Sequence, residues 1–157
     1  MKITFMMVGR TTTPYIQQAF DDYMRRAGRY MAMETVMIPD VKAAKRASPQ
    51  IQKQAEGAEI LQRLKADDRV VLLDERGRQY TSREFASLID RSAVQGLRNL
   101  VFIIGGPYGF AAEVYERANS QISLSKMTFP HELIRLFFAE QLYRAMTILR
   151  GEPYHHD

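Results

Sequence analysis

The feature that most constrains the fold is an alternation of short apolar runs with longer segments whose apolar residues recur at helical spacing. Five apolar runs read as strands, over 2–9, 33–39, 68–77, 99–106 and 121–125. Strands that are apolar throughout, and that alternate with helices, are typical of a parallel sheet buried on both faces. The sequence therefore predicts an α/β fold, a mostly parallel sheet with helices on both faces.

The segments between these runs carry the start signals of helices. Three starts are marked by a capping residue, followed by proline or by glutamate at capping-box spacing: Thr13-Pro14, Ser48-Pro49, and Thr81 with Glu84. A short helix is expected over 111–119 and a long one over 130–151. Each expected helix follows an apolar run, as a strand–helix–strand chain requires.

Length and composition indicate one globular domain, 1–157. The chain has 157 residues, of which 46% are hydrophobic, so it can bury a full core. It has no cysteine, no apolar run of about 20 residues, and no apolar segment behind a basic start. We therefore expect a cytoplasmic protein that neither crosses a membrane nor uses cysteine chemistry. The net charge of +4 favours polyanionic partners but is also common in proteins without them.

The last expected helix, 130–151, is apolar around nearly its whole circumference. Such a helix must be buried on more than one side. In a chain of this size the second burying surface is expected to be another subunit, which predicts a homodimer. The alternative is a central helix inside a monomer.

The run 103–110, IIGGPYGF, follows an expected strand and holds three glycines and a proline. At the carboxyl end of a parallel strand, glycines let backbone groups approach a ligand closely. The run has neither the lysine of a phosphate-binding P-loop nor the glycine order of a dinucleotide site, so a nucleotide hydrolase is disfavoured. The alternative is a tight turn from strand to helix.

The remaining catalytic inventory is small. No serine lies in a nucleophile elbow, and His131 at a helix start has no second histidine at metal-site spacing. His155, His156 and Asp157 are adjacent, which makes a poor metal site, and no metal is expected. These features favour a reaction in which positioning supplies most of the rate.

Several motifs together resemble the SPOUT-class methyltransferases that modify N3 of a pseudouridine in large-subunit ribosomal RNA. They are IIGGPYGF and the run ISLSKMTFPHELIRLFFAEQLYRAMTILRGEPYHH from Ile122, supported by MKITFMMVG and VVLLDERG. The likeness covers essentially the whole chain. Phe110 stands where relatives often have leucine, and a second histidine, His156, follows His155.

The resemblance implies a deep trefoil knot in the carboxyl-terminal half, bound S-adenosylmethionine, and an obligate homodimer that acts on 23S rRNA within the ribosome. Composition would not have suggested the knot, because knotted chains are rare. The cofactor-binding residues that it implies come from three loops: Leu73, Gly105, Leu124, Ser125, Lys126, Met127, Thr128 and Phe129. In this picture glycine at 105 leaves room for the cofactor, and Leu73 covers its adenine.

The resemblance also implies a substrate side formed by Arg144, Tyr154 and His155. Arg144 would contact a phosphate or the developing charge, Tyr154 would position or stack on the flipped base, and His155 would accept the proton. An imidazole suits that role because it titrates near about pH 6.5 when unperturbed. The alternative for the three is a surface ion pair, a packing aromatic and a loose tail.

Seven basic residues are expected to contact phosphates, with solvated surface charge as the alternative: Lys42, Lys45, Arg46, Lys53, Arg25, Arg26 and Arg29. Two other functions remain open. One is a SPOUT methyltransferase for another RNA, such as transfer RNA. The other is a non-catalytic RNA-binding dimer, against which the intact glycine loop and the SKMTF and PYH motifs argue.

Overall fold

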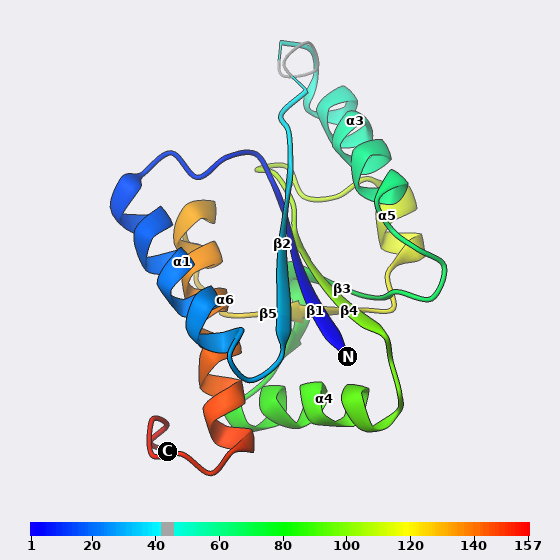
Figure 1. Cartoon of the computed structure of the whole chain (residues 1–157). Helices are drawn as coiled ribbons and strands as arrows, with labels where there is room; N and C mark the ends of the chain where they lie inside the picture. The colour runs from blue at the N-terminus through cyan, green and yellow to red at the C-terminus, as the bar shows by residue number, and fades with distance from the viewer. Residues whose placement is uncertain (42–45) are drawn as a thin grey trace.

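The computed structural model describes residues 1–41 and 46–157, and within them the sheet has five strands. They are β1 (Lys2–Val8), β2 (Ala32–Ile38), β3 (Arg69–Gln79), β4 (Asn99–Ile104) and β5 (Ser120–Ser123). The order across the sheet is β2-β1-β4-β3-β5, and the strand pairs are parallel (Figure 1). The predicted parallel α/β sheet is therefore confirmed.

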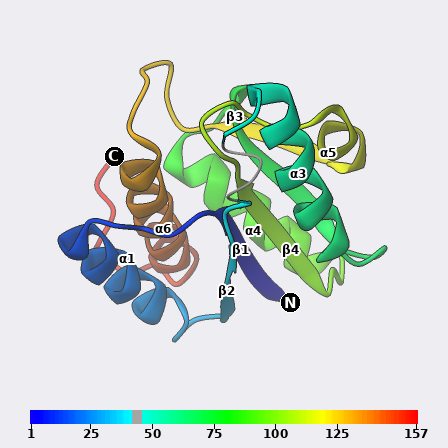
Figure 2. The same cartoon turned by 90° about the horizontal axis from the view of Figure 1, so that it is seen from above.

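Helices cover both faces of this sheet, as predicted. They are α1 (Pro14–Ala27), α3 (Pro49–Gln62), α4 (Ser82–Val94), α5 (Ala112–Arg117) and α6 (His131–Leu149). One apolar core joins α1, α4 and α6 to the sheet, and a second joins α3 and α5 to the opposite face. Figure 2 shows the two groups on either side of the sheet.

Successive side chains along each strand point to opposite faces of the sheet, so the same strands supply both cores. Phe5 and Phe102 face α6, where the Phe138 ring lies 4.9 Å from each of them, centroid to centroid. Met6, which follows Phe5, and Val101 and Ile103, which flank Phe102, point to the α3 and α5 side. Each such aromatic pair contributes about 1 kcal/mol beyond its buried area. The sheet is thus fixed from both faces, which gives the loops at its ends a rigid base.

Two of the three predicted helix caps form as expected. The Ser48 hydroxyl accepts from the backbone N–H of Ile51 at 3.2 Å, and Thr81 with Glu84 forms a complete capping box. Thr13 occupies the N-cap position of α1, but its side chain makes no cap hydrogen bond. Instead, the backbone N–H of Thr13 donates to the carboxylate of Glu132 on α6 at 3.1 Å. A tertiary contact therefore secures this helix start.

Helix α6 packs between α1 and α4, which explains most of its apolar character within one chain. Two of its large apolar side chains still reach the surface, Phe137 at 41% exposure and Leu149 at 39%. The homodimer that the apolar circumference suggested stays a prediction, and so does the knot.

A bulge interrupts the pairing of β3 with β5. Leu73 and Arg78 both pair with Ile122, so residues 74–77 lie outside the ladder. A Cβ atom at Gly77 would fall 2.5 Å from the carbonyl carbon of Ile122, far inside contact distance. Glycine is therefore required where the bulge of β3 lies against the backbone of β5, and 74–77 is held at the carboxyl end of the sheet.

Candidate functional site

A cavity of about 710 Å³ lies at the carboxyl ends of β3, β4 and β5, and we call it the sheet-end cavity. Its walls come from 73–76, 104–110, 122–125 and 127–131, with two further side chains. Ligands in parallel α/β folds bind at this edge of the sheet, and the volume is in the range of sites for cofactors and small ligands.

Three loops bring together the cofactor-binding residues that the resemblance implied. Those that line the sheet-end cavity are Leu73, Gly105, Leu124, Ser125, Met127, Thr128 and Phe129. Lys126 belongs to the same loop but is exposed and does not line the cavity. Residues more than 50 positions apart in sequence thus form one concave surface.

The glycine loop is a tight turn that also forms a wall of the cavity. Gly109 has φ +80°, a conformation that favours glycine, and its N–H donates to the Gly106 carbonyl at 3.2 Å. A Cβ atom at Gly105 would lie 2.9 Å from the ring of Phe110. The space that this glycine leaves is therefore filled by Phe110, and its role in admitting a cofactor stays a prediction.

The loop before α6 is held by its own serines. The Ser123 hydroxyl donates to the Ser125 carbonyl at 3.0 Å, and the Ser125 hydroxyl accepts from the backbone N–H of Met127 at 2.9 Å. Such local hydrogen bonds fix turn conformations. Phe129 stacks edge-on against Phe137 of α6, with ring centroids 5.4 Å apart. The loop is therefore anchored at both ends.

A polar rim of the cavity was missed in the sequence. Asp74 accepts from the Tyr115 hydroxyl and from the backbone N–H of Arg76, while the Arg76 guanidinium lies over the Tyr115 ring at 5.0 Å. Burial raises the pKa of Asp74, but the hydrogen bonds from Tyr115 and Arg76 outweigh it, so the pKa is lowered. The signal was available, because Asp74 follows the apolar run of β3, as the glycine loop follows β4.

A second missed feature fastens α6 to the loop after β1. Glu132 accepts from the N–H groups of Thr12 and Thr13, and the hydrogen bond from Thr13 is the main cause that lowers its pKa. Arg135, fully buried, donates to the Val8 carbonyl at 2.6 Å and to a threonine hydroxyl. Desolvation lowers the pKa of this guanidinium. A charged pair three residues apart in an apolar helix was a signal that α6 makes a polar contact, but it did not identify the partner segment.

The three residues expected on the substrate side do come together, around Glu140 of α6. We call Glu140, Arg144, Tyr154 and His155 the tail cluster. Arg144 donates to the Glu140 carboxylate at 2.6 and 3.0 Å, and Tyr154 donates to the same oxygen at 3.0 Å. The Arg144 guanidinium also lies over the Tyr154 ring at 4.8 Å. Burial and then the bond to Glu140 raise the pKa of Tyr154, which therefore acts as a neutral donor.

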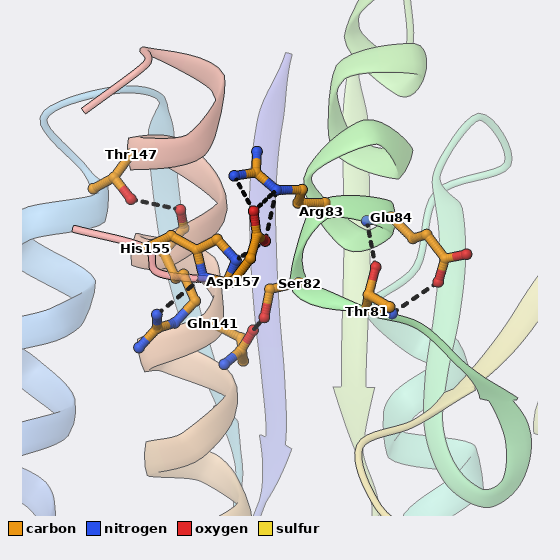
Figure 3. Close-up of polar contacts among 9 residues, drawn as sticks. Thr81, Ser82, Arg83, Glu84, Gln141, Thr147, His155 and Asp157 are labelled. Atoms are coloured by element: carbon orange, nitrogen blue, oxygen red, sulfur yellow. Dashed lines mark hydrogen bonds and ion pairs between the residues drawn. The ribbon is translucent and has the colours of Figure 1, made fainter. Parts of the chain in front are cut away.

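Asp157 links the tail cluster to Arg83 of α4 (Figure 3). His155 Nδ1 lies 3.2 Å from Arg144 Nη1, and His155 Nε2 lies 3.0 Å from Asp157 Oδ1. Asp157 accepts three hydrogen bonds from Arg83, at 2.7, 2.9 and 2.7 Å. Arg83 and then His155 lower the pKa of Asp157 to about 2. The other histidine, His156, is exposed.

Within one chain, the tail cluster and the sheet-end cavity are separate. The cavity contacts α6 at His131 and Ile134, and none of Arg144, Tyr154 and His155 lines it. Ten residues separate Ile134 from Arg144, which is about 15 Å along the helix axis. One chain therefore does not unite the expected cofactor and substrate residues.

The expected phosphate-contacting residues lie in different settings. Arg25 and Arg26 form ion pairs with Asp22, and with Arg29 they are exposed on the last turn of α1 and just beyond it. Arg46 is exposed and Lys53 half-buried. The other two expected residues, Lys42 and Lys45, lie outside the described residues.

Among residues 1–41 and 46–157, no three histidine, cysteine or acidic side chains are grouped so that they could hold a metal ion. In the same part of the chain, no helix has the length and apolar character that a membrane span needs.

Comparison with known proteins places this geometry in a family. The model described as "Predicted SPOUT methyltransferase" matches residues 1–155. Proteins named "Ribosomal RNA large subunit methyltransferase H" are 52% identical in Porphyromonas gingivalis and 48% identical in Bacteroides fragilis, over 100% of both chains in each case.

A solved structure, "a probable methylase family protein from Haemophilus influenzae Rd KW20", has the same fold. It has a TM-score of 0.55 at 13% identity, covering 99% of this chain and 70% of that one. The family resemblance noted in the sequence is thereby confirmed. The chain belongs to the SPOUT methyltransferase family.

Proposed function

We propose that the protein transfers a methyl group from S-adenosylmethionine to large-subunit (23S) ribosomal RNA, at N3 of a pseudouridine in the assembled, cytoplasmic ribosome. The observation that carries this proposal is the sheet-end cavity, lined by the loops that the family resemblance assigned to the cofactor. Family membership and the names of the full-length relatives support it.

The chemistry of the cavity lining fits this cofactor. Leu73, Ile104 and Phe129 offer apolar surface for an adenine ring, and the Ser125 and Thr128 hydroxyls offer partners for a ribose. The acidic residues Asp74 and Glu75 also line the cavity and are opposite in sign to a sulfonium and an ammonium group, and Arg76 on the same wall pairs with Asp74. When bound, S-adenosylmethionine supplies an electrophilic methyl group and leaves as a neutral thioether.

The residues of the tail cluster fit the acceptor side of the reaction. The imide N–H is a poor nucleophile until its proton moves to a base, and His155 carries an imidazole for that step. With the cofactor bound, the imide proton would go to His155, and the N3 lone pair would become available to accept the methyl group. Arg144 stabilises negative charge on the base or on a phosphate, and Tyr154 positions the base.

The complete site requires a homodimer in this proposal. Cofactor and acceptor residues must meet within bonding distance, yet one chain separates them along α6. In the proposed two-fold dimer, the tail cluster of each subunit would lie beside the cavity of the other. The exposed Phe137 and Leu149 give α6 apolar surface for that contact.

The RNA backbone would lie on basic surface near these sites. We assign phosphate contacts to Arg25, Arg26 and Arg29 at the end of α1, to Arg46 shortly before α3, and to Lys53 within α3. A small enzyme with few such contacts would depend on the shape of the ribosome for recognition.

The experiment is transfer of label from S-adenosylmethionine to intact ribosomes, isolated subunits and bulk transfer RNA, followed by mapping of the labelled nucleotide. We expect label on N3 of a pseudouridine in the large-subunit RNA. Label on transfer RNA would assign another RNA substrate. Cofactor binding without transfer to any of these RNAs would contradict the proposed substrate, and failure to bind S-adenosylmethionine would support a non-catalytic RNA-binding dimer.

The variants His155→Ala and Arg144→Ala test the acceptor side. We expect each to lower kcat by about 10² to 10³ fold, the usual effect of removing an acid–base or charge-stabilising group, with cofactor affinity unchanged. The exposed neighbour His156→Ala is the matched control and is expected to be active. Wild-type rates for both test variants would remove these residues from the mechanism.

A further inference from the structure

An ion pair outside the assigned site, between Arg83 and Asp157, contacts His155 through Asp157. Arg83 lies at the start of α4 and Asp157 follows the tail cluster, and Figure 3 shows Asp157 between Arg83 and the His155 ring. Three hydrogen bonds join Arg83 to Asp157, and one of the two Asp157 oxygens also lies 3.0 Å from His155 Nε2. Arg144 lies 3.2 Å from the other ring nitrogen, Nδ1, so the imidazole has a charged partner on each of its two nitrogens.

These partners determine which nitrogen carries the proton. A guanidinium only donates, so His155 Nδ1, at 3.2 Å from Arg144, must accept. A carboxylate only accepts, so Nε2 must donate to Asp157. Both contacts select the same tautomer of the neutral ring, with the proton on Nε2 and the lone pair on Nδ1.

Arg83 in turn fixes the carboxylate. The guanidinium contacts both Asp157 oxygens, a planar arrangement that restricts rotation of the carboxylate. Arg83 is anchored in α4, whose first turn carries the capping box of Thr81 and Glu84. Helix α4 also contacts α6 through a hydrogen bond from the Ser82 hydroxyl to Gln141 at 2.9 Å. The orientation of His155 thus depends on two helices as well as on its own segment.

We infer that Arg83 and Asp157 are positioning residues, which hold His155 with Nε2 protonated and with Nδ1 as the atom that accepts the substrate proton. The inference rests on the proposed function. Arg144 occupies Nδ1 in this structure, so Nδ1 becomes available when the guanidinium turns to the RNA. Contact of Arg144 with the negative charge of the RNA and release of His155 Nδ1 as the proton acceptor would then occur together.

The direct test is nitrogen-15 NMR of the protein without RNA, with the His155 signals identified by their loss in His155→Ala. We expect one neutral tautomer, with Nδ1 unprotonated and Nε2 protonated. A ring protonated on Nδ1 would overturn the inference. This measurement does not need methyl transfer, so it separates failure of the inference from failure of the proposed function.

The kinetic test uses Asp157→Ala, Arg83→Gln and the double variant. We expect each single variant to lower kcat by about tenfold, as misplacement of a catalytic group does, with KM for S-adenosylmethionine unchanged. The double variant should be no slower than either single one, because both act through one ring. Asp157→Glu should recover part of the rate. Asp90→Ala and Arg91→Gln, exposed on the same helix, are the matched controls.

A structural role would give a different pattern. In the His155→Ala background, Asp157→Ala should leave the residual rate unchanged if Asp157 acts only through the ring. The inference would be contradicted if Asp157→Ala lowered kcat by the same factor in the His155→Ala background as in the wild type. It would also be contradicted if both single variants kept the wild-type kcat.

Discussion

In the sheet-end cavity the walls are backbone turns and apolar side chains at the ends of three strands, whereas the tail cluster is a chain of charged side chains on α6 and the residues that follow it. The cavity has its shape because the sheet is packed on both faces. The tail cluster has its shape because its charged and polar groups pair with complementary partners. Changes to the backbone should therefore damage the first region, and changes of charge the second.

The largest effect is expected from Gly77→Ala, in the segment that forms the rim of the cavity. The new methyl group would meet the backbone of Ile122 at 2.5 Å, and backbone cannot rotate away. We expect about 3 kcal/mol of destabilisation, the cost of a severe overpacking, together with loss of cofactor binding. Thermal unfolding and calorimetric titration with S-adenosylmethionine are the measurements.

Gly96→Ala is the control for that variant. Gly96 has φ +77° but open space around it, so it should cost only about 1 kcal/mol of backbone strain and leave cofactor binding intact. Equal destabilisation by the two variants would show that the bulge in the β3–β5 pairing has no special part in forming the cavity.

A smaller effect is expected when Arg25, Arg26 and Arg29 are all replaced by Gln. Log affinity for ribosomes decreases as log salt increases. If these side chains bind phosphates, the slope of that decrease should become shallower by about one for each phosphate that is no longer neutralised. Arg91→Gln on α4 controls for the general reduction of charge. An unchanged slope would leave the tail cluster, and not the end of α1, as the RNA-facing region.

The smallest effect concerns the pH dependence of the Arg83–Asp157 ion pair. The pKa of Asp157 is lowered from 3.8 to about 2, so this ion pair stabilises the fold above about pH 4, and its contribution disappears as the pH falls through 2. The pair is exposed, so salt should weaken it. Carbon-13 NMR of the Asp157 carboxyl group gives the titration, and a midpoint near 3.8 would mean that the ion pair is absent in solution.

Local signals were enough to predict much of the fold. The apolar runs identified the strands, and two of the three proposed caps form, at Ser48 and at Thr81 with Glu84. These features depend on neighbours in sequence. The cofactor loops were assigned by resemblance, and the structure brings all of their residues except Lys126 to one cavity.

Contacts between distant segments were not predictable in the same way. Glu132 caps α1 in place of the Thr13 side chain, across 119 positions, and no local pattern specifies that pairing. The same holds for Arg83 and Asp157, 74 positions apart. Long-range polar pairs depend on how helices pack, so they become visible only in the folded chain.

The central claim is that the cavity of one subunit works with the tail cluster of the other. The most direct test mixes two inactive variants: Leu73→Trp, which should fill the cavity and whose loss of cofactor binding is verified first, and His155→Ala. After the subunits exchange, half of the dimers are mixed, and each mixed dimer has one intact site if the sites are shared. We predict recovery of about one quarter of the wild-type rate. A mixture as inactive as its components, with exchange demonstrated, would contradict the claim.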